Sequence, residues 1–273
     1  MPQVAVFDTA FHQTLPPHAY IYALPYELYE KHRIRRYGFH GISHRFIAQE
    51  AARTLNRPAE ELRLITCHLG NGSSIAAIKH GRSVDTTMGF TPLEGLAMGT
   101  RCGDLDPAIV LFLQDQEGLS QAEVSDLLNK KSGMAGLSGC SSDMREILRA
   151  VYLDGQKGAL NKAHPQHVRS KLALDVYIYR IKKYIGAYAA AMGGVDAIVF
   201  TGGIGQNLSV VQEDACNGLQ FMDVETGPAR DMGNGCYCLS KPTSGVKVLA
   251  MPTEEELMIA RETLEILQAD KGA

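Results

Sequence analysis

A glycine-rich turn, His68 to Ser74 (HLGNGSS), stands between two apolar runs in the first third of the chain. Gly70 and Gly72 lack a Cβ atom, so the backbone can adopt positive φ angles there and bring its N–H groups close to an anion. Asn71 adds an amide donor, and two serine hydroxyls follow. These groups suit phosphate binding. The same residues also fit an ordinary β-hairpin, because Asn-Gly between apolar runs is a strong hairpin signal, and on this stretch alone the hairpin is favoured.

A second glycine group, Gly202, Gly203 and Gly205, follows the apolar run of residues 195–201. A buried strand that ends in such a turn, with a helix after it, lets backbone N–H groups meet the negative charge of a nucleotide. GGxG alone is weak evidence. Neither the dinucleotide fingerprint GxGxxG nor the P-loop motif GxxxxGK[ST] occurs in the chain, so the pattern supports neither a Rossmann nor a P-loop site.

Three ionisable side chains stand at positions suited to chemistry. Asp8 ends a predicted strand over residues 4–7, where a carboxylate fits a metal or catalytic role as well as it fits capping the next turn. A single histidine in a loop is usually structural, but His40 lies beside Phe39 and between two glycines just before a predicted helix, which makes a binding role more credible. Arg101 lies in a long loop rich in glycine and proline, and its guanidinium is a planar fork of donors that matches a carboxylate or a phosphate.

Three acids, Glu254, Glu255 and Glu256, open the last predicted helix. Acids at a helix start often only complement the helix dipole. One of them is equally able to help hold a hydrated Mg²⁺. The sequence leaves both interpretations open.

The pattern around these residues predicts an α/β fold with a mixed sheet and flanking helices. Strands are expected at 62–67, 75–78 and 82–87 as an antiparallel meander, and at 195–201 and 246–251. Helices are expected at 25–32, at 44–55 after a Ser43 cap, at 108–114, 120–130, at 141–152 after a Ser141 or Ser142 cap, at 166–192 and at 257–268. Residues 88–107 and the stretch SGMAGLSG (132–139) are expected to be loops that contact ligand.

The longest predicted helix, residues 166–192, carries Val168, Leu172, Val176, Tyr179 and Tyr184 near helical spacing. This stripe suits packing in the core or across a dimer interface, and the core is the default interpretation.

Composition limits the class of protein. With 273 residues, 45% of them hydrophobic, the chain can bury a large core. A net charge of -3 gives no general attraction to nucleic acid or to an anionic membrane, so any anion site must be local. The six cysteines form no CxxC pair, and the first residues lack the pattern of a signal peptide. We therefore expect a cytoplasmic protein with reduced thiols.

Seven motifs, taken in order, resemble the acetate kinase family of the actin-like, sugar-kinase and Hsp70 ATPase superfamily. They are VFDTAFH, YGFHGISH, HLGNGSS, GTRCGDLDP, SSDMREI, FTGGIGQN and PTEEELMIARET. The resemblance covers almost the whole chain. It implies an actin-like, ribonuclease-H-like ATPase domain, reversible phosphoryl transfer between ATP and acetate with Mg²⁺, and a homodimer.

The resemblance also implies roles for individual residues. Asp8 and Glu255 would be the metal-associated acids, with Asp8, His40 and Arg101 catalytic. Phe39 and Pro92 would line the pocket for the acetate methyl group, beside Arg101. The nucleotide would be held by His68, Gly70, Asn71, Gly72, Asp143, Arg145, Gly202, Gly203, Ile204, Gly205 and Asn207.

The family pattern has an earlier glycine turn and a second substrate arginine that this chain does not match. We therefore expect a C-terminal portion of the family's fold, with one lobe over residues 12–253 and a remnant of the other lobe in 1–11 and 254–273. Two alternatives stay open beside an acetate kinase. One is a propionate or butyrate kinase, and the other is a catalytically silent domain that dimerises and binds nucleotide.

Overall fold

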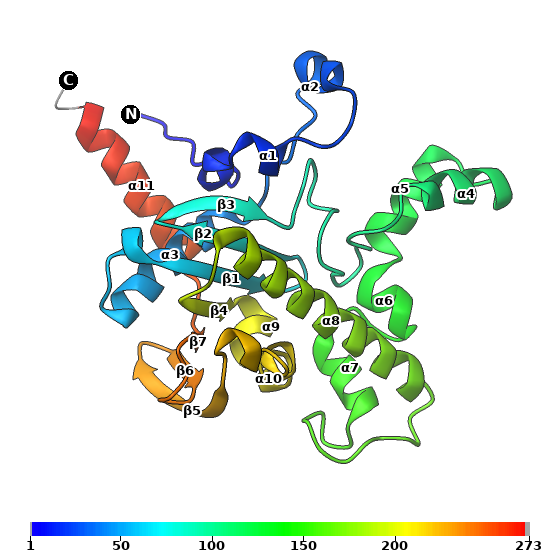
Figure 1. Ribbon diagram of the computed structural model, residues 1–273. Helices are drawn as coiled ribbons and strands as arrows, with labels where there is room; N and C mark the ends of the chain where they lie inside the picture. Colours follow the sequence, from blue (N-terminus) through cyan, green and yellow to red (C-terminus); the bar gives the residue numbers. More distant parts are fainter. Residues whose placement is uncertain (1, 271–273) are drawn as a thin grey trace.

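A mixed sheet forms the centre of the computed structural model, which describes residues 2–270 (Figure 1). Within these residues the sheet has seven strands in the order β3-β2-β1-β4-β7-β6-β5. The strands are β1 (Arg63–Leu69), β2 (Ser73–Lys79), β3 (Arg82–Thr86), β4 (Ala197–Thr201), β5 (Thr226–Gly233), β6 (Cys236–Ser240) and β7 (Lys247–Ala250). The predicted meander of β1, β2 and β3 is confirmed, since both of its pairs are antiparallel.

The middle of the sheet is parallel, and this arrangement brings the two glycine turns together. β1 pairs in parallel with β4, which pairs in parallel with β7, whereas β6 is antiparallel to β7 and β5 to β6. His68 near the end of β1 lies opposite Thr201 at the end of β4. The turns that follow these two strands therefore leave the sheet at the same edge.

Helices cover both faces of the sheet and extend beyond it (Figure 1). The α-helices are α1 (Pro17–Tyr20), α2 (Tyr26–His32), α3 (Gly41–Leu55), α4 (Ala108–Gln116), α5 (Gln121–Lys130), α6 (Gly133–Ser138), α7 (Met144–Val151), α8 (His167–Met192), α9 (Gly202–Asn207), α10 (Ser209–Cys216) and α11 (Glu255–Asp270). Short 3₁₀ helices are η1 (Ala10–Thr14), η2 (Ala59–Glu61) and η3 (Gln220–Met222).

The alternation of side chains along the strands produces two hydrophobic layers. Ile65 and Phe200 point to the side covered by α6, α7, α8 and α10, where they join the larger core. Leu64 and Val199 point to the other side and pack with α3 and with Met258 of α11. Both layers are closed by helices, so the predicted mixed sheet with flanking helices is confirmed.

Four local predictions are wrong. Residues 4–7 form no strand, because no described strand lies beside them to supply ladder hydrogen bonds. Ser43 does not cap α3, which begins at Gly41 with His40 as its N-cap. SGMAGLSG is not a loop, since Gly133–Ser138 forms α6. Asp143, and neither Ser141 nor Ser142, caps α7.

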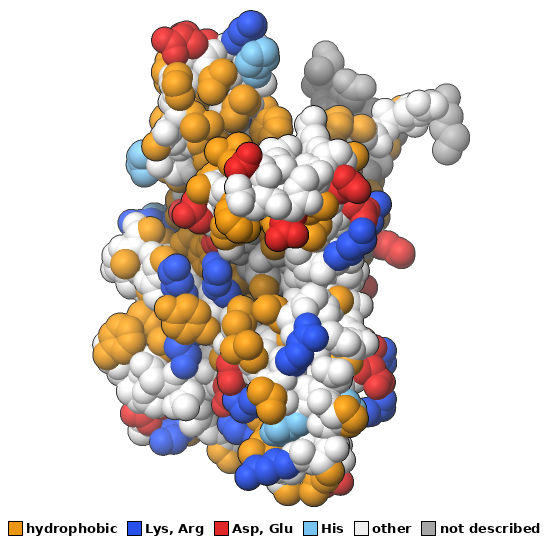
Figure 2. Space-filling view, turned by 90° about the vertical axis from the view of Figure 1, so that its right-hand side faces the viewer, with side chains coloured by type: hydrophobic (Ala, Val, Ile, Leu, Met, Phe, Trp, Pro, Cys, Tyr) orange, Lys and Arg blue, Asp and Glu red, His pale blue; other side chains and the backbone are white. Residues whose placement is uncertain are grey.

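The prediction of which face of the longest helix is buried is also wrong. Val168, Leu172 and Tyr179 of α8 are exposed, and the buried stripe is the one that holds Tyr177 and Ile181. Figure 2 views the side on which α4 and α5 project in Figure 1, and hydrophobic side chains gather there in groups between Lys and Arg side chains.

Two further observations concern the residues that the structure describes. All six cysteines are free thiols. None of the helices within residues 2–270 combines the length and the apolar character that crossing a membrane requires.

Candidate active site

The turn between β1 and β2 is the hairpin that the sequence favours. Leu69 lies opposite Ser73, and the Gly70 N–H donates to the Gly72 carbonyl at 3.0 Å across the bend. The exposed Asn71 forms the tip, and its carbonyl accepts from the Gly99 N–H at 3.1 Å. A Cβ atom on Gly99 would lie 2.2 Å from the Asn71 side-chain oxygen, so glycine is needed there for Asn71 to keep this position.

A cleft of about 700 Å³ opens beside this turn. Its volume is within the range of small-ligand sites. Three segments that lie far apart in sequence form its walls, namely the hairpin, the start of α7, and α9 with the residue after it. The lining residues are Gly70, Asn71, Ser142, Asp143, Met144, Arg145, Gly203, Ile204, Asn207 and Leu208.

Seven of the eleven residues predicted to bind nucleotide line this cleft, and four do not. Gly202 and Gly205 lie against β1 instead. Gly202 has a φ of +77°, and a Cβ atom there would lie 2.6 Å from the Leu69 carbonyl oxygen. These two glycines bring α9 close to β1 and so fix one wall of the cleft. His68 and Gly72 belong to a neighbouring group of residues.

An ion pair stands at the wall formed by α7. The Asp143 carboxylate accepts from the backbone N–H of Arg145 at 2.9 Å and from its guanidinium at 2.6 Å. The hydrogen bonds from Arg145 hold the pKa of Asp143 below its ordinary value. Asp143 therefore both caps α7 and forms the ion pair with Arg145 at the wall of the cleft.

His40 and Arg101 meet at the other side of the hairpin. A Cβ atom on Gly72 would lie 3.4 Å from Nε2 of His40 and 3.6 Å from an Nη atom of Arg101. The sequence placed these two residues on separate loops, and the structure brings them to the same glycine. The turn therefore lies between the cleft, which Gly70 and Asn71 line, and these two side chains, which approach Gly72.

Burial, followed by the charge of Arg101, lowers the pKa of His40 to about 4. At neutral pH His40 is therefore an uncharged ring with one N–H. Next to the permanent charge of Arg101, it can offer a hydrogen bond without adding a second positive charge.

Asp8 holds the backbone of His40 in an unusual conformation. Its carboxylate accepts from the His40 N–H at 2.7 Å, and its carbonyl accepts from the Gly41 N–H at 2.9 Å. His40 has a φ of 56°, in the left-handed region that few side chains adopt. Such conformations persist only where the surroundings enforce them, and they cluster at functional sites.

Asp8 and Glu255 are close enough for their charges to interact. Burial and then the charge of Asp8 raise the pKa of Glu255. No group of three or more metal-ligating side chains occurs within residues 2–270. Mg²⁺ keeps several water ligands and binds proteins through one or two carboxylates together with substrate phosphates. Two neighbouring carboxylates therefore fit this ion.

Neighbouring side chains form hydrogen bonds to the backbone carbonyls of the two residues predicted to line the methyl pocket, Pro92 and Phe39. An Nη of Arg101 donates to the Pro92 carbonyl at 3.3 Å, and Nε2 of His12 donates to the Phe39 carbonyl at 3.1 Å. The role of the Phe39 and Pro92 side chains stays a prediction.

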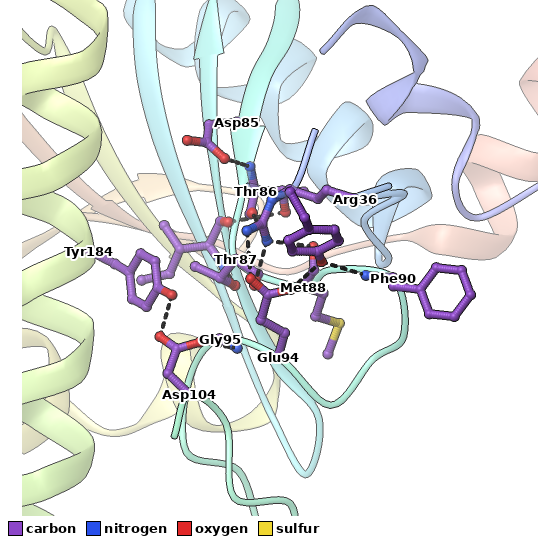
Figure 3. A network of polar contacts seen from close by, with 12 residues as sticks. Arg36, Asp85, Thr86, Thr87, Met88, Phe90, Glu94, Gly95, Asp104 and Tyr184 are labelled. Atoms are coloured by element: carbon purple, nitrogen blue, oxygen red, sulfur yellow. Dashed lines mark hydrogen bonds and ion pairs between the residues drawn. The ribbon is translucent and has the colours of Figure 1, made fainter. Parts of the chain in front are cut away.

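A polar network supports the loop that carries Pro92 and Arg101 (Figure 3). Arg36 donates to the carbonyls of Thr86, Thr87 and Met88 at 3.0–3.2 Å and pairs with Glu94 at 2.6 Å. Tyr22 donates to the same carboxylate. The other end of this part of the loop is fixed by Asp104, which accepts from the Gly95 N–H at 2.9 Å and from Tyr184.

Sequence reasoning missed a group of buried histidines behind His40. His12 and His44 are fully buried, and His44 hydrogen-bonds to Thr66 and Ser74. The available signal was polar residues on β1 and β2 at positions that face α3, where an apolar layer would otherwise continue.

The strand order, the two glycine turns at one sheet edge and the cleft between them define an α/β protein with the actin-like ATPase fold. Comparison with known proteins narrows this class. The model of the Acetokinase family matches residues 1–261. The chain belongs to the acetokinase family.

Relatives and solved structures agree with this assignment. The acetate kinase of Desulfitobacterium hafniense is 56% identical over 269 residues, which cover 98% of this chain. The crystal structure of Porphyromonas gingivalis acetate kinase superposes with a TM-score of 0.86 at 49% identity, over 96% of this chain and 63% of that one. A propionate kinase from Francisella tularensis gives 0.81 at 38% identity, over 94% and 62%. The chain spans 64% of the length of the Desulfitobacterium relative.

Proposed function

We propose that this chain carries the catalytic groups of an ATP-dependent acetate kinase, which forms acetyl phosphate and ADP. One observation carries the proposal: the same glycine hairpin lines the cleft with Gly70 and Asn71 and meets His40 and Arg101 at Gly72. A nucleotide in the cleft would present its terminal phosphate to these two side chains. The family assignment supports this reading.

The reaction suits the residues present. Acetate is already ionised at neutral pH, so it needs no general base to become a nucleophile. The difficulty is to bring one anion against another. Arg101 neutralises charge on the transferring group, and His40 donates a hydrogen bond to it as charge redistributes.

Asp8 and Glu255 would be the residues that hold Mg²⁺. When bound, the ion would neutralise charge on the phosphate oxygens. The backbone contact from Asp8 to His40 would tie the position of the metal site to that of the histidine.

The exposed stripe Val168, Leu172 and Tyr179 on α8 supports a homodimer as the assembled form, because surface hydrophobic groups of this kind often mark protein interfaces. The division into a lobe of residues 12–253 and a second unit of 1–11 with 254–273 rests on the resemblance alone.

A propionate kinase is the second candidate, favoured by the structural similarity to the Francisella protein. The two candidates differ by one methylene in the substrate, which a pocket distinguishes only modestly. Comparison of kcat/KM for acetate, propionate and butyrate separates them.

Formation of acetyl phosphate tests the proposal. The purified chain is assayed with ATP, Mg²⁺ and acetate, alone and together with the separately supplied part of the Desulfitobacterium relative that the match does not cover. Product in either mixture, lost in Arg101→Ala, is the expected result. Nucleotide binding with no product in both mixtures would favour the catalytically silent domain and overturn the proposal.

A further inference from the structure

A chain of four side chains leads from the interior of the sheet to His40. The Thr66 hydroxyl lies 2.7 Å from Nδ1 of His44, and Nε2 of His44 lies 2.7 Å from the Ser74 hydroxyl. The same Ser74 oxygen lies 2.9 Å from Nδ1 of His40. Thr66, His44 and Ser74 are fully buried. Every proton shared among these four side chains must therefore find its acceptor within the protein.

The protons in the three hydrogen bonds that join Thr66, His44, Ser74 and His40 can be arranged in only two ways. A serine hydroxyl has one hydrogen, so Ser74 donates to one ring nitrogen and accepts from the other. His44 is enclosed in the core, and burial holds its pKa well below the ordinary value, so the ring is neutral and has one N–H. The three hydrogen bonds must then all run toward His40 or all run away from it.

Thr66 decides between the two directions. If the bonds run away from His40, the N–H of His44 donates to Thr66, and the threonine hydrogen needs another acceptor. Within residues 2–270 the Thr66 hydroxyl has no hydrogen-bond partner other than His44. That direction leaves a buried donor unsatisfied, which is costly. In the other direction Thr66 donates to His44, His44 donates to Ser74, and Ser74 donates to His40, with every group satisfied.

We propose that Thr66, His44 and Ser74 form a one-directional hydrogen-bond relay that holds His40 as the Nε2–H tautomer. Nδ1 of His40 accepts from Ser74, so the proton of the neutral ring is on Nε2. That atom would lie 3.4 Å from a Cβ atom on Gly72, a position that an Nη of Arg101 approaches to 3.6 Å. Phosphoryl oxygens only accept hydrogen bonds, and the relay gives them a donor. The role of the relay in catalysis rests on the function proposed above, whereas the tautomer of His40 can be measured whatever the function of the protein is.

His12 provides an internal comparison. Its Nε2 lies 3.1 Å from the Phe39 carbonyl, which can only accept, so Nε2 has the proton and Nδ1 accepts from Ser83 at 2.8 Å. This tautomer is fixed by a carbonyl, whereas that of His40 is fixed through three side chains. A substitution in the relay should therefore change His40 and leave His12 unchanged.

Nitrogen NMR of the purified chain tests the relay. The chain is labelled with ¹⁵N-histidine, and the His40 signals are assigned by their loss in His40→Gln. We expect a protonated Nε2 and an unprotonated Nδ1. Thr66→Val keeps the shape of the side chain but removes the hydroxyl, so the His40 nitrogen shifts should move toward each other as both tautomers become populated. Thr66→Ser should restore the original shifts, and Ser83→Ala should leave them in place.

The outcomes are distinct from those of the activity assay. A His40 ring protonated on Nδ1, or shifts that do not change in Thr66→Val, would overturn the relay even in an active enzyme. The expected shifts in a protein that makes no acetyl phosphate would leave the relay standing and remove the proposed function. If Thr66→Val does not fold, Ser74→Ala breaks the chain next to His40 and must give the same loss of a single tautomer.

Discussion

The imidazole ring of His40 stacks on that of His68, with 4.3 Å between the ring centroids and 26° between the planes. Burial lowers the pKa of His68 to about 3, and the proximity of His40 contributes. With His12 and His44 behind them, these rings form a group that the fold keeps uncharged.

The first prediction is that acid destabilises the chain through these histidines. Burial lowers the pKa of His12 from 6.5 to about 4, so the unfolded chain binds a proton more readily than the folded chain between these values. The contribution of His12 to the free energy of unfolding is fully present above about pH 6.5. It falls by on the order of 3 kcal/mol as the pH drops toward 4. Urea unfolding followed by circular dichroism at pH 7 and pH 5 measures the change.

His18→Gln is the control for this prediction, because His18 is exposed. The variant should show the same loss of stability between pH 7 and pH 5 as the original chain. Equal free energies of unfolding at the two pH values in the original chain would contradict the prediction.

The second prediction concerns the two arginines at the ends of the site. Arg101→Ala should lower kcat by about 10²–10³-fold, because we propose that its guanidinium neutralises charge that builds up in the transition state. It should change the Kd for ADP much less. Arg145→Ala is the matched control, since Arg145 lines the cleft in which we propose that the nucleotide binds, and it should mainly affect nucleotide affinity. Kinetics and ADP titration on both variants check this, and an equal loss in kcat and affinity for Arg101→Ala would argue against its role.

The third prediction is that the network in Figure 3 sets the position of the loop that carries Pro92, a residue proposed to line the substrate pocket. Glu94→Ala removes the partner of Arg36 and the acceptor for Tyr22. The loop segment with Pro92 then loses an anchor two residues away. We expect the KM for the carboxylate substrate to rise about tenfold, equivalent to about 1.4 kcal/mol, with little change in ADP affinity.

Tyr22→Phe separates the two parts of that network. It keeps the ion pair of Arg36 with Glu94 and removes only the hydroxyl, which also accepts from the Phe90 N–H at 2.9 Å. Its effect on KM should be smaller than that of Glu94→Ala. A larger effect, or a change in ADP affinity alone, would show that the ion pair does not position the loop.

The sequence revealed local features whose signal is contained in a few adjacent residues. The hairpin at Gly70 and Gly72 and the helix expected at 120–130 are examples, because the bonds that form them join residues two to four positions apart. The meeting of His40 with Arg101 joins two loops, so no local pattern contains it, and only the family resemblance suggested it.

The hairpin of β5 and β6 was missed for a different reason. β5 has the sequence TGPARDMG, in which glycine, proline and aspartate all disfavour a strand. β5 lies at the edge of the sheet and pairs only with β6 among the described strands, and edge strands tolerate proline. Its strand conformation comes from that neighbour. The burial of His44 was also missed, since only the positions of Thr66 and Ser74 make a buried histidine acceptable.

The last prediction compares two adjacent glycines at the start of α9. Gly202 has a φ of +77°, and a Cβ atom there would lie 2.6 Å from the Leu69 carbonyl oxygen, a backbone atom that cannot move aside easily. Gly203 has no atom within 4 Å of its Cβ position and no positive φ. Gly202→Ala should therefore lower the free energy of unfolding by about 2 kcal/mol or more, and Gly203→Ala should change it by less than about 1 kcal/mol. Chemical denaturation of both variants measures the difference. Because Gly203 lines the cleft, its variant should instead weaken ADP binding, and equal stability losses in the two variants would refute the close approach of α9 to β1.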